Sequence, residues 1–128
     1  MAGLACMAGA LAAVSPQDSA NHKLRMNEAQ ELKYEVIEAL QAGDLPQVVS
    51  ATERMHPLLA AEITYWSNSG LADIHDLSRD NLALARQVTV AAQGNDLDAT
   101  IAAWGKLEAS CSGCHDLHPE QRIVYEAK

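Results

Sequence analysis

Four helical stretches separated by short breaks most limit the folds open to this chain of 128 residues. Between about Asn21 and Ala42, apolar residues recur every three or four positions. This spacing places them on one face of a helix. Similar apolar stripes follow from Leu45, Ser78 and Asp96. Because only short Gly, Asn, Asp, Ser and Pro segments interrupt these stretches, the sequence predicts an all-α fold.

The breaks in the first half of the chain carry residues that are typical of helix ends. Gly43 is expected to end the first helix, and Asp44 to begin a second one with Pro46 in its first turn. Pro57 lies inside the second stretch, where it is expected to kink one continuous helix because the apolar stripe keeps its phase. The Asn-Ser-Gly sequence at 68–70 is expected to end this helix.

The second half of the chain is predicted to hold two more helices. The segment 71–77 is less regular and is expected to be a loop, after which Ser78 caps a third helix. Asp96 is expected to cap a fourth helix, which Pro119 ends. Four helices with short connections pack as an antiparallel up-down-up-down bundle. We predict this four-helix bundle for residues 21–128.

The N-terminal residues form a different kind of segment. Met1–Val14 consists almost wholly of Ala, Gly, Leu, Met and Val, which resembles the hydrophobic region of a secretory signal peptide. Cleavage is expected after Ala12. We therefore expect residues 1–20 to be a signal-peptide remnant with a disordered leader, and the protein to be exported to the periplasm. The apolar stretch is too short to span a membrane.

Near the C-terminus, two thiols and an imidazole occur in the fixed spacing Cys111-Ser-Gly-Cys114-His115. C-x-x-C-H is the attachment signature of c-type haem. Two thiols three positions apart on a helix or turn can bond the two vinyl-derived carbons of one haem. The histidine that follows then lies under the iron as its proximal ligand. The motif therefore predicts one covalently bound haem c, with its iron held by His115.

A C-x-x-C pair is also compatible with a redox dithiol or with half of a zinc site. A zinc site needs two more ligands, and the sequence has no second C-x-x-C and no H-x-x-x-H. A thioredoxin-like dithiol usually opens a helix after a strand, whereas this motif closes a long helical stretch. Haem is therefore the preferred interpretation.

The charge of the chain limits its partners. A net charge of −8 and a pI near 4.9 argue against nucleic-acid binding, because phosphate contacts need a basic surface. An acidic surface suits docking to a basic redox partner. No nucleophile–base pair and no pair of carboxylates stands out in the sequence. We therefore do not expect the protein to be an enzyme.

A helical bundle with C-x-x-C-H near the end of its last helix resembles the class II c-type cytochromes, which include cytochrome c′ and low-spin cytochromes such as c-556. The resemblance covers roughly residues 20–118. It implies that Cys111 and Cys114 carry the thioether attachments, that His115 is the proximal ligand, and that the haem lies between the helices. Relatives in this class often dimerise through their first two helices, so a homodimer is possible.

The residue opposite His115 separates electron transfer from gas binding. The family takes its sixth ligand, or a blocking apolar residue, from the first helix. Met26 lies on the apolar stripe there and is the preferred ligand, while His22, one turn earlier on the same face, would give a bis-histidine haem. The resemblance also implies that Arg25 pairs with a haem propionate.

The sequence therefore predicts a periplasmic monohaem cytochrome that carries single electrons through a six-coordinate haem. The alternative is a five-coordinate, cytochrome c′-like protein whose open iron site binds NO or CO.

Overall fold

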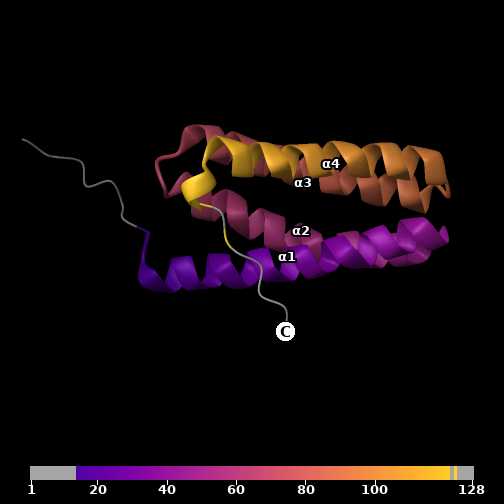
Figure 1. Cartoon of the computed structure of the whole chain (residues 1–128), viewed down its shortest axis with the longest axis horizontal. Helices are drawn as coiled ribbons and strands as arrows, with labels where there is room; N and C mark the ends of the chain where they lie inside the picture. The colour runs from indigo at the N-terminus through magenta and orange to yellow at the C-terminus, as the bar shows by residue number, and fades with distance from the viewer. Residues whose placement is uncertain (1–13, 122, 124–128) are drawn as a thin grey trace, which may run out of the picture.

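Four α-helices and one short 3-10 helix make up the computed structural model, which describes residues 14–121 and 123 (Figure 1). Helix α2 packs against α1 and α3, and α3 packs against α4. The prediction of four packed helices is confirmed, and the described residues include no strand. The elements are α1 Pro16–Ala42, α2 Leu45–Ser67, α3 Ala72–Gln93, α4 Leu97–Leu117 and η1 Pro119–Gln121.

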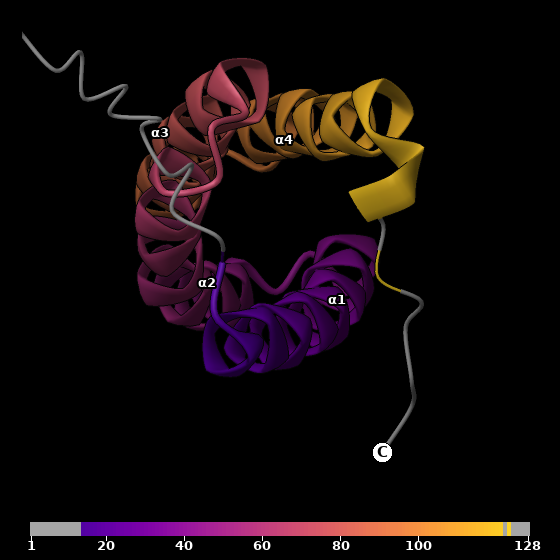
Figure 2. The same ribbon diagram turned by 90° about the vertical axis from the view of Figure 1, so that its left-hand side faces the viewer.

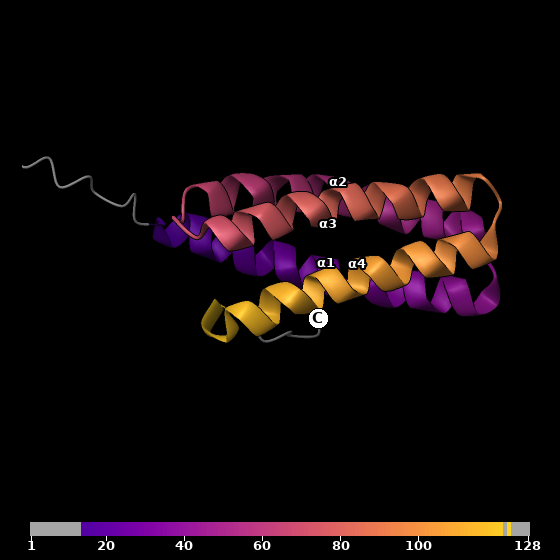
Figure 3. The same ribbon diagram turned by 90° about the horizontal axis from the view of Figure 1, so that it is seen from above.

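The helices are joined at alternating ends of the molecule. The α1–α2 and α3–α4 connections lie at one end, and the α2–α3 connection lies at the other (Figures 1 and 3). The start of α1 and the end of α4 are found at this second end. Seen from there, the four helices form a ring in which α1 and α4 are the first and last members (Figure 2). The chain therefore brings the start of its first helix and the end of its last helix to the same end of the fold.

Side-chain caps fix the starts of three helices. The predicted caps Asp44 and Asp96 are confirmed, since each carboxylate accepts a hydrogen bond from a backbone N–H three residues later, at 3.1 and 3.0 Å. Helix α1 begins at Pro16 rather than near Asn21. Its cap is Ser15, whose Oγ accepts a hydrogen bond from the Asp18 N–H at 3.1 Å, and proline is favoured in the first helical position.

Helix α1 extends into the segment that the sequence analysis assigned to the leader. Residues 16–20 are helical, although the sequence placed them in a disordered leader. Residues 1–13 of the predicted signal segment, including the cleavage position after Ala12, lie outside the described residues.

Helix α3 also begins earlier than predicted. The expected loop at 71–77 is wrong, because the helix starts at Ala72. Ser78 is not a cap but lies buried inside the helix, where its hydroxyl donates to the His75 carbonyl at 2.7 Å. A serine that satisfies its hydroxyl on the preceding turn is compatible with a helix interior. The side chain of Ile74 is buried too, and its removal from water stabilises the added turn.

The core is aliphatic, with one tryptophan, and runs along the middle of the bundle. Helix α2 continues without a break from Leu45 to Ser67, which confirms the single helix predicted across Pro57. The buried core residues from the four helices are Leu32, Val36, Ala39, Leu45, Val48, Ala51, Met55, Leu59, Leu82, Ala85, Val88, Ala92, Trp104 and Leu107. Among the described residues, no helix is both long and apolar enough to cross a membrane.

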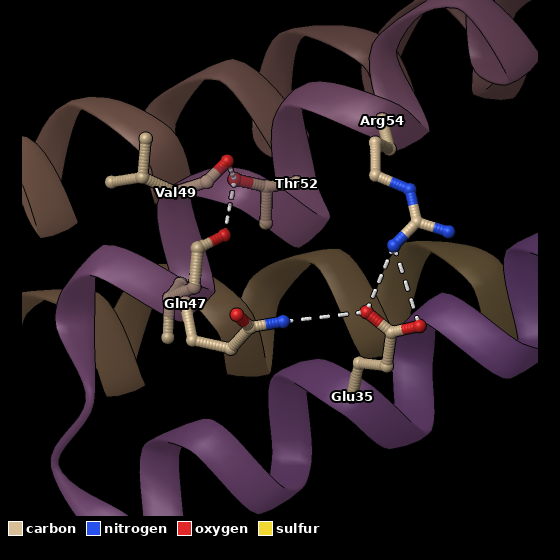
Figure 4. Close-up of polar contacts among 6 residues, drawn as sticks. Glu35, Gln47, Val49, Thr52 and Arg54 are labelled. Carbon is tan, nitrogen blue, oxygen red and sulfur yellow. Dashed lines mark hydrogen bonds and ion pairs between the residues drawn. The ribbon is translucent and has the colours of Figure 1, made fainter.

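Polar side chains join α1 to α2 at the surface of the bundle. Arg54 Nη1 donates to Glu35 Oε2 at 3.1 Å, and Gln47 Nε2 reaches the same oxygen at 3.4 Å (Figure 4). Because both charged side chains are largely in water, this ion pair contributes only about 0–1 kcal/mol. On the neighbouring turn, the buried hydroxyl of Thr52 donates to the Val48 carbonyl at 2.8 Å. The contacts of Arg54 and Gln47 with Glu35 help fix the pairing of α1 with α2, while burial of the core supplies most of the stability.

Candidate cofactor site

A cavity of about 180 Å³ lies between the four helices. It is built from the early part of α1 and α3 and from the late part of α2 and α4, so it lies at the end where α1 begins and α4 finishes. An apolar cavity of roughly 150 Å³ already accommodates a benzene-sized ligand. Most of the lining is apolar, and its apolar members include Ala29, Met55, Leu59, Trp66, Ile74 and Leu107.

The cavity brings together residues that are far apart in the sequence. His22 and Met26 line it from α1, and Cys111, Cys114 and His115 line it from α4. His22 is buried and Met26 is partly buried. The two cysteines are also partly buried, whereas His115 is exposed at the rim. Five of the six site residues predicted from sequence therefore meet in one place, with the sixth, Arg25, next to it.

The two cysteine side chains are free thiols. Burial raises the pKa of Cys111 to about 11, and the neighbouring Cys114 adds to this effect. Burial likewise raises the pKa of the Cys114 thiol, with the charges of Asp73 and Glu62 as smaller causes. Both groups therefore keep their hydrogen at neutral pH. A nucleophilic redox dithiol needs a lowered pKa, so these surroundings do not favour a dithiol site.

A buried carboxylate that sequence analysis missed holds His22 and Arg25. Glu62 on α2 is 3% exposed and His22 is 5% exposed. Glu62 Oε2 lies 2.6 Å from His22 Nδ1, and Glu62 Oε1 lies 2.6 Å from Arg25 Nε. In the structure, therefore, Arg25 makes its ion pair with Glu62. These three residues, which we call the His22–Glu62–Arg25 cluster, tie the start of α1 to the end of α2.

Aromatic rings enclose the His22 imidazole. The Tyr65 ring stacks on it at a centroid distance of 4.4 Å and an interplanar angle of 5°. The Trp66 ring meets it edge-on at 5.1 Å and 79°. Arg25 Cζ lies 5.8 Å from the centre of the Tyr65 ring, within the range of a cation–π contact. The hydrogen bond to Glu62 and the two rings together fix the position and tilt of the imidazole.

Two buried polar atoms beside the cavity have no hydrogen-bond partner among the described residues: Asn81 Oδ1 and Trp104 Nε1. Both residues line the cavity. Buried polar atoms are nearly always satisfied in folded proteins, so these two atoms stand out beside the cavity.

The end of α4 is tied to the start of α3 by His118. Its Nε2 lies 2.7 Å from Asp73 Oδ2, and its Nδ1 lies 2.9 Å from Glu120 Oε1. The hydrogen bonds to Asp73 and to Glu120 raise the pKa of His118, and the hydrogen bond from His118 lowers the pKa of Asp73. An imidazolium between two carboxylates donates from both ring nitrogens. This contact holds the segment that follows the C-x-x-C-H motif against α3.

The His118–Asp73 contact predicts a pH-dependent stability. A raised folded-state pKa of His118 stabilises the fold at pH values below the ordinary histidine pKa, and this contribution is lost as the pH rises through the folded value. The lowered pKa of Asp73 stabilises the fold above the ordinary aspartate pKa and is lost on acidification. The difference in Tm between wild type and His118→Gln should thus be greatest between about pH 4 and pH 6.5, and should vanish in alkaline solution.

This prediction is measured by circular dichroism melts of both proteins across that pH range. The effect is expected to be small, because the ion pair is exposed to solvent. A difference in Tm that grew above neutral pH would contradict the assignment of a charged His118.

Glu62 could have been found from its position in the sequence. It lies three residues after Leu59 and four before Trp66, which is the spacing of the buried face of α2. A carboxylate in that position needs a buried partner. Its two partners are on another helix, 37 and 40 residues away in the chain, so the sequence pattern alone does not identify them.

Within residues 14–121 and 123, no group of three or more His, Cys, Asp or Glu side chains is arranged to hold a metal ion. Comparison of the chain with protein-family models, with curated proteins and with solved structures finds no match.

Proposed function

We propose that the protein is a periplasmic monohaem c-type cytochrome of the class II kind, which carries single electrons. The haem would be attached near the C-terminal end of the last helix of an antiparallel up-down-up-down bundle. One observation carries the proposal: Cys111, Cys114 and His115 line the same largely apolar cavity as His22 and Met26 from the first helix. Attachment groups and candidate axial ligands therefore face one binding space.

The surroundings fit a haem in two respects. The apolar lining suits the flat macrocycle, because burial of apolar surface is favourable. Trp104 and Asn81, whose buried polar atoms have no hydrogen-bond partner among the described residues, also line this cavity. Cys111 and Cys114 would each add across one vinyl group, the sulfur to one carbon and the thiol hydrogen to the other. This addition needs no external oxidant or reductant.

The bound haem would supply one-electron chemistry, and the protein would supply position and environment. His115 would hold the iron from the proximal side. The apolar lining of the cavity would limit water around the iron, and burial of this kind is one determinant of the reduction potential. The net charge of −8 favours a redox partner with a basic docking surface.

Absorption spectra of the matured protein test this proposal. We expect denatured protein to keep its haem, and the native ferric and ferrous forms to give low-spin spectra that do not change when CO is added. A ferrous form that is high-spin and binds CO at once would contradict electron transfer and would favour the five-coordinate alternative. Protein that holds no haem after maturation would refute both.

A further inference from the structure

We propose that His22 would hold the haem iron together with His115, and that Glu62 is the positioning residue that orients His22. This inference rests on the proposed haem site and names its second ligand. It differs from the expectation for Met26, which follows from the resemblance. The starting observation is that the one buried histidine among the described residues lines the cavity and binds a buried carboxylate.

The contact with Glu62 determines which nitrogen of His22 is available. The Arg25 guanidinium is always charged, and its Nε lies 2.6 Å from Glu62 Oε1, so Glu62 acts as its carboxylate counter-ion. A carboxylate accepts hydrogen bonds, so His22 Nδ1 carries the hydrogen and donates it to Oε2 at 2.6 Å. With Nδ1 engaged by Glu62, Nε2 is the ring nitrogen left to bind a metal. Histidine that binds a metal through one nitrogen while the other donates to a carboxylate is a recurring arrangement in metalloproteins.

The imidazole is also held in place before any ligand binds. The stacked Tyr65 ring, the Trp66 edge and the Glu62 carboxylate contact it from different directions. A ligand that is fixed in advance loses little conformational freedom on binding. Met26 lies one turn further along α1 and also lines the cavity, but a thioether on three rotatable bonds is an adaptable packing residue.

The burial of this cluster is costly for the fold alone. Removing a histidine, a glutamate and most of an arginine from water carries a desolvation penalty. Apolar side chains of similar size often give equal or greater stability in such a place. The neighbouring lining residues Leu59 and Ile74 show that this cavity wall accepts aliphatic residues. If the His22 imidazole binds a ligand in the cavity, that function explains why these polar residues are buried there.

The test compares three variants of the matured protein with wild type: His22→Gly, Met26→Leu and Glu62→Gln. Wild type should give a low-spin ferric spectrum without the methionine–iron charge-transfer band, and Met26→Leu should leave it unchanged. His22→Gly should turn high-spin and bind CO in the ferrous state, and added imidazole should restore the low-spin spectrum. Glu62→Gln should weaken the His22–iron bond roughly 10–100-fold, so its ferrous form should bind CO, although less readily than that of His22→Gly.

His56→Gln is the matched control, because His56 is a partly buried histidine on α2 that binds Thr89 Oγ1 at 3.0 Å and does not line the cavity. Its spectrum should match wild type. A charge-transfer band that disappears in Met26→Leu would overturn the inference and leave the cytochrome proposal intact. Covalent haem absent from wild type would refute the cytochrome itself. If His22→Gly fails to fold, the wild-type and Met26→Leu spectra still decide the question.

Discussion

Replacing both motif cysteines with serine (Cys111→Ser/Cys114→Ser) is expected to abolish covalent haem attachment completely. A serine hydroxyl has almost the shape of a thiol but does not form the thioether. Both positions are partly buried on α4, so the helix should persist. The measurement is haem staining after denaturing electrophoresis, together with the intact mass. Wild type should keep the stain and exceed the mass of its polypeptide by one haem, whereas the double variant should show neither.

Ser112→Ala is the matched control for this experiment, because it changes an exposed residue between the two cysteines and leaves both thiols in place. Its stain should equal that of wild type. Haem that stays attached to the double variant under denaturing conditions would disprove thioether attachment at this motif. Wild-type protein that carries zinc in place of haem would revive the zinc interpretation of the cysteine pair.

Leu32→Ala is expected to lower the free energy of unfolding by about 2–5 kcal/mol. Leu32 on α1 is 0% exposed and belongs to the core cluster that joins the four helices. Its truncation removes apolar contacts and leaves a cavity that the neighbouring helices fill only partly. Urea unfolding followed by circular dichroism measures the change, with matched haem loading in both proteins.

Leu24→Ala provides the comparison on the same helix. Leu24 is 67% exposed, so its truncation should change the free energy of unfolding by no more than about 0.5 kcal/mol. Equal effects for the two variants would mean that α1 does not present this face to the core. A Leu32→Ala protein with wild-type stability would have the same meaning.

Helix starts were predictable from the sequence where a side chain caps the helix after a clear break. Asp44 caps α2 and Asp96 caps α4 in this way. The start of α3 was not, because Leu71 precedes it without a side-chain cap and the turn around Ile74 is stabilised by burial. Burial depends on the other helices, so a local pattern does not contain it. Ser15 and Pro16 did carry a signal for α1, but the apolar stripe used to find the helix starts later.

The candidate site was predictable as a set of residues but not as a set of contacts. The spacing of the C-x-x-C-H motif identified Cys111, Cys114 and His115, and the resemblance directed attention to α1. The partners of His22 come from α2, and Asn81 comes from α3. Neither helix was expected to supply polar groups to the cavity. The burial of Glu62 changes the expected role of Arg25, since its nearest anion is a side chain of the protein.

The walls of the cavity include both the first and the last helix, and this has a consequence for folding. His22 and His115 are about 90 residues apart in the sequence, and closing a loop of that length costs roughly 4 kcal/mol in chain entropy before constant terms. No shorter piece of the chain contains both walls of the cavity. The binding space therefore arises only when all four helices have assembled. Binding in this cavity thus depends on the folding of the whole bundle.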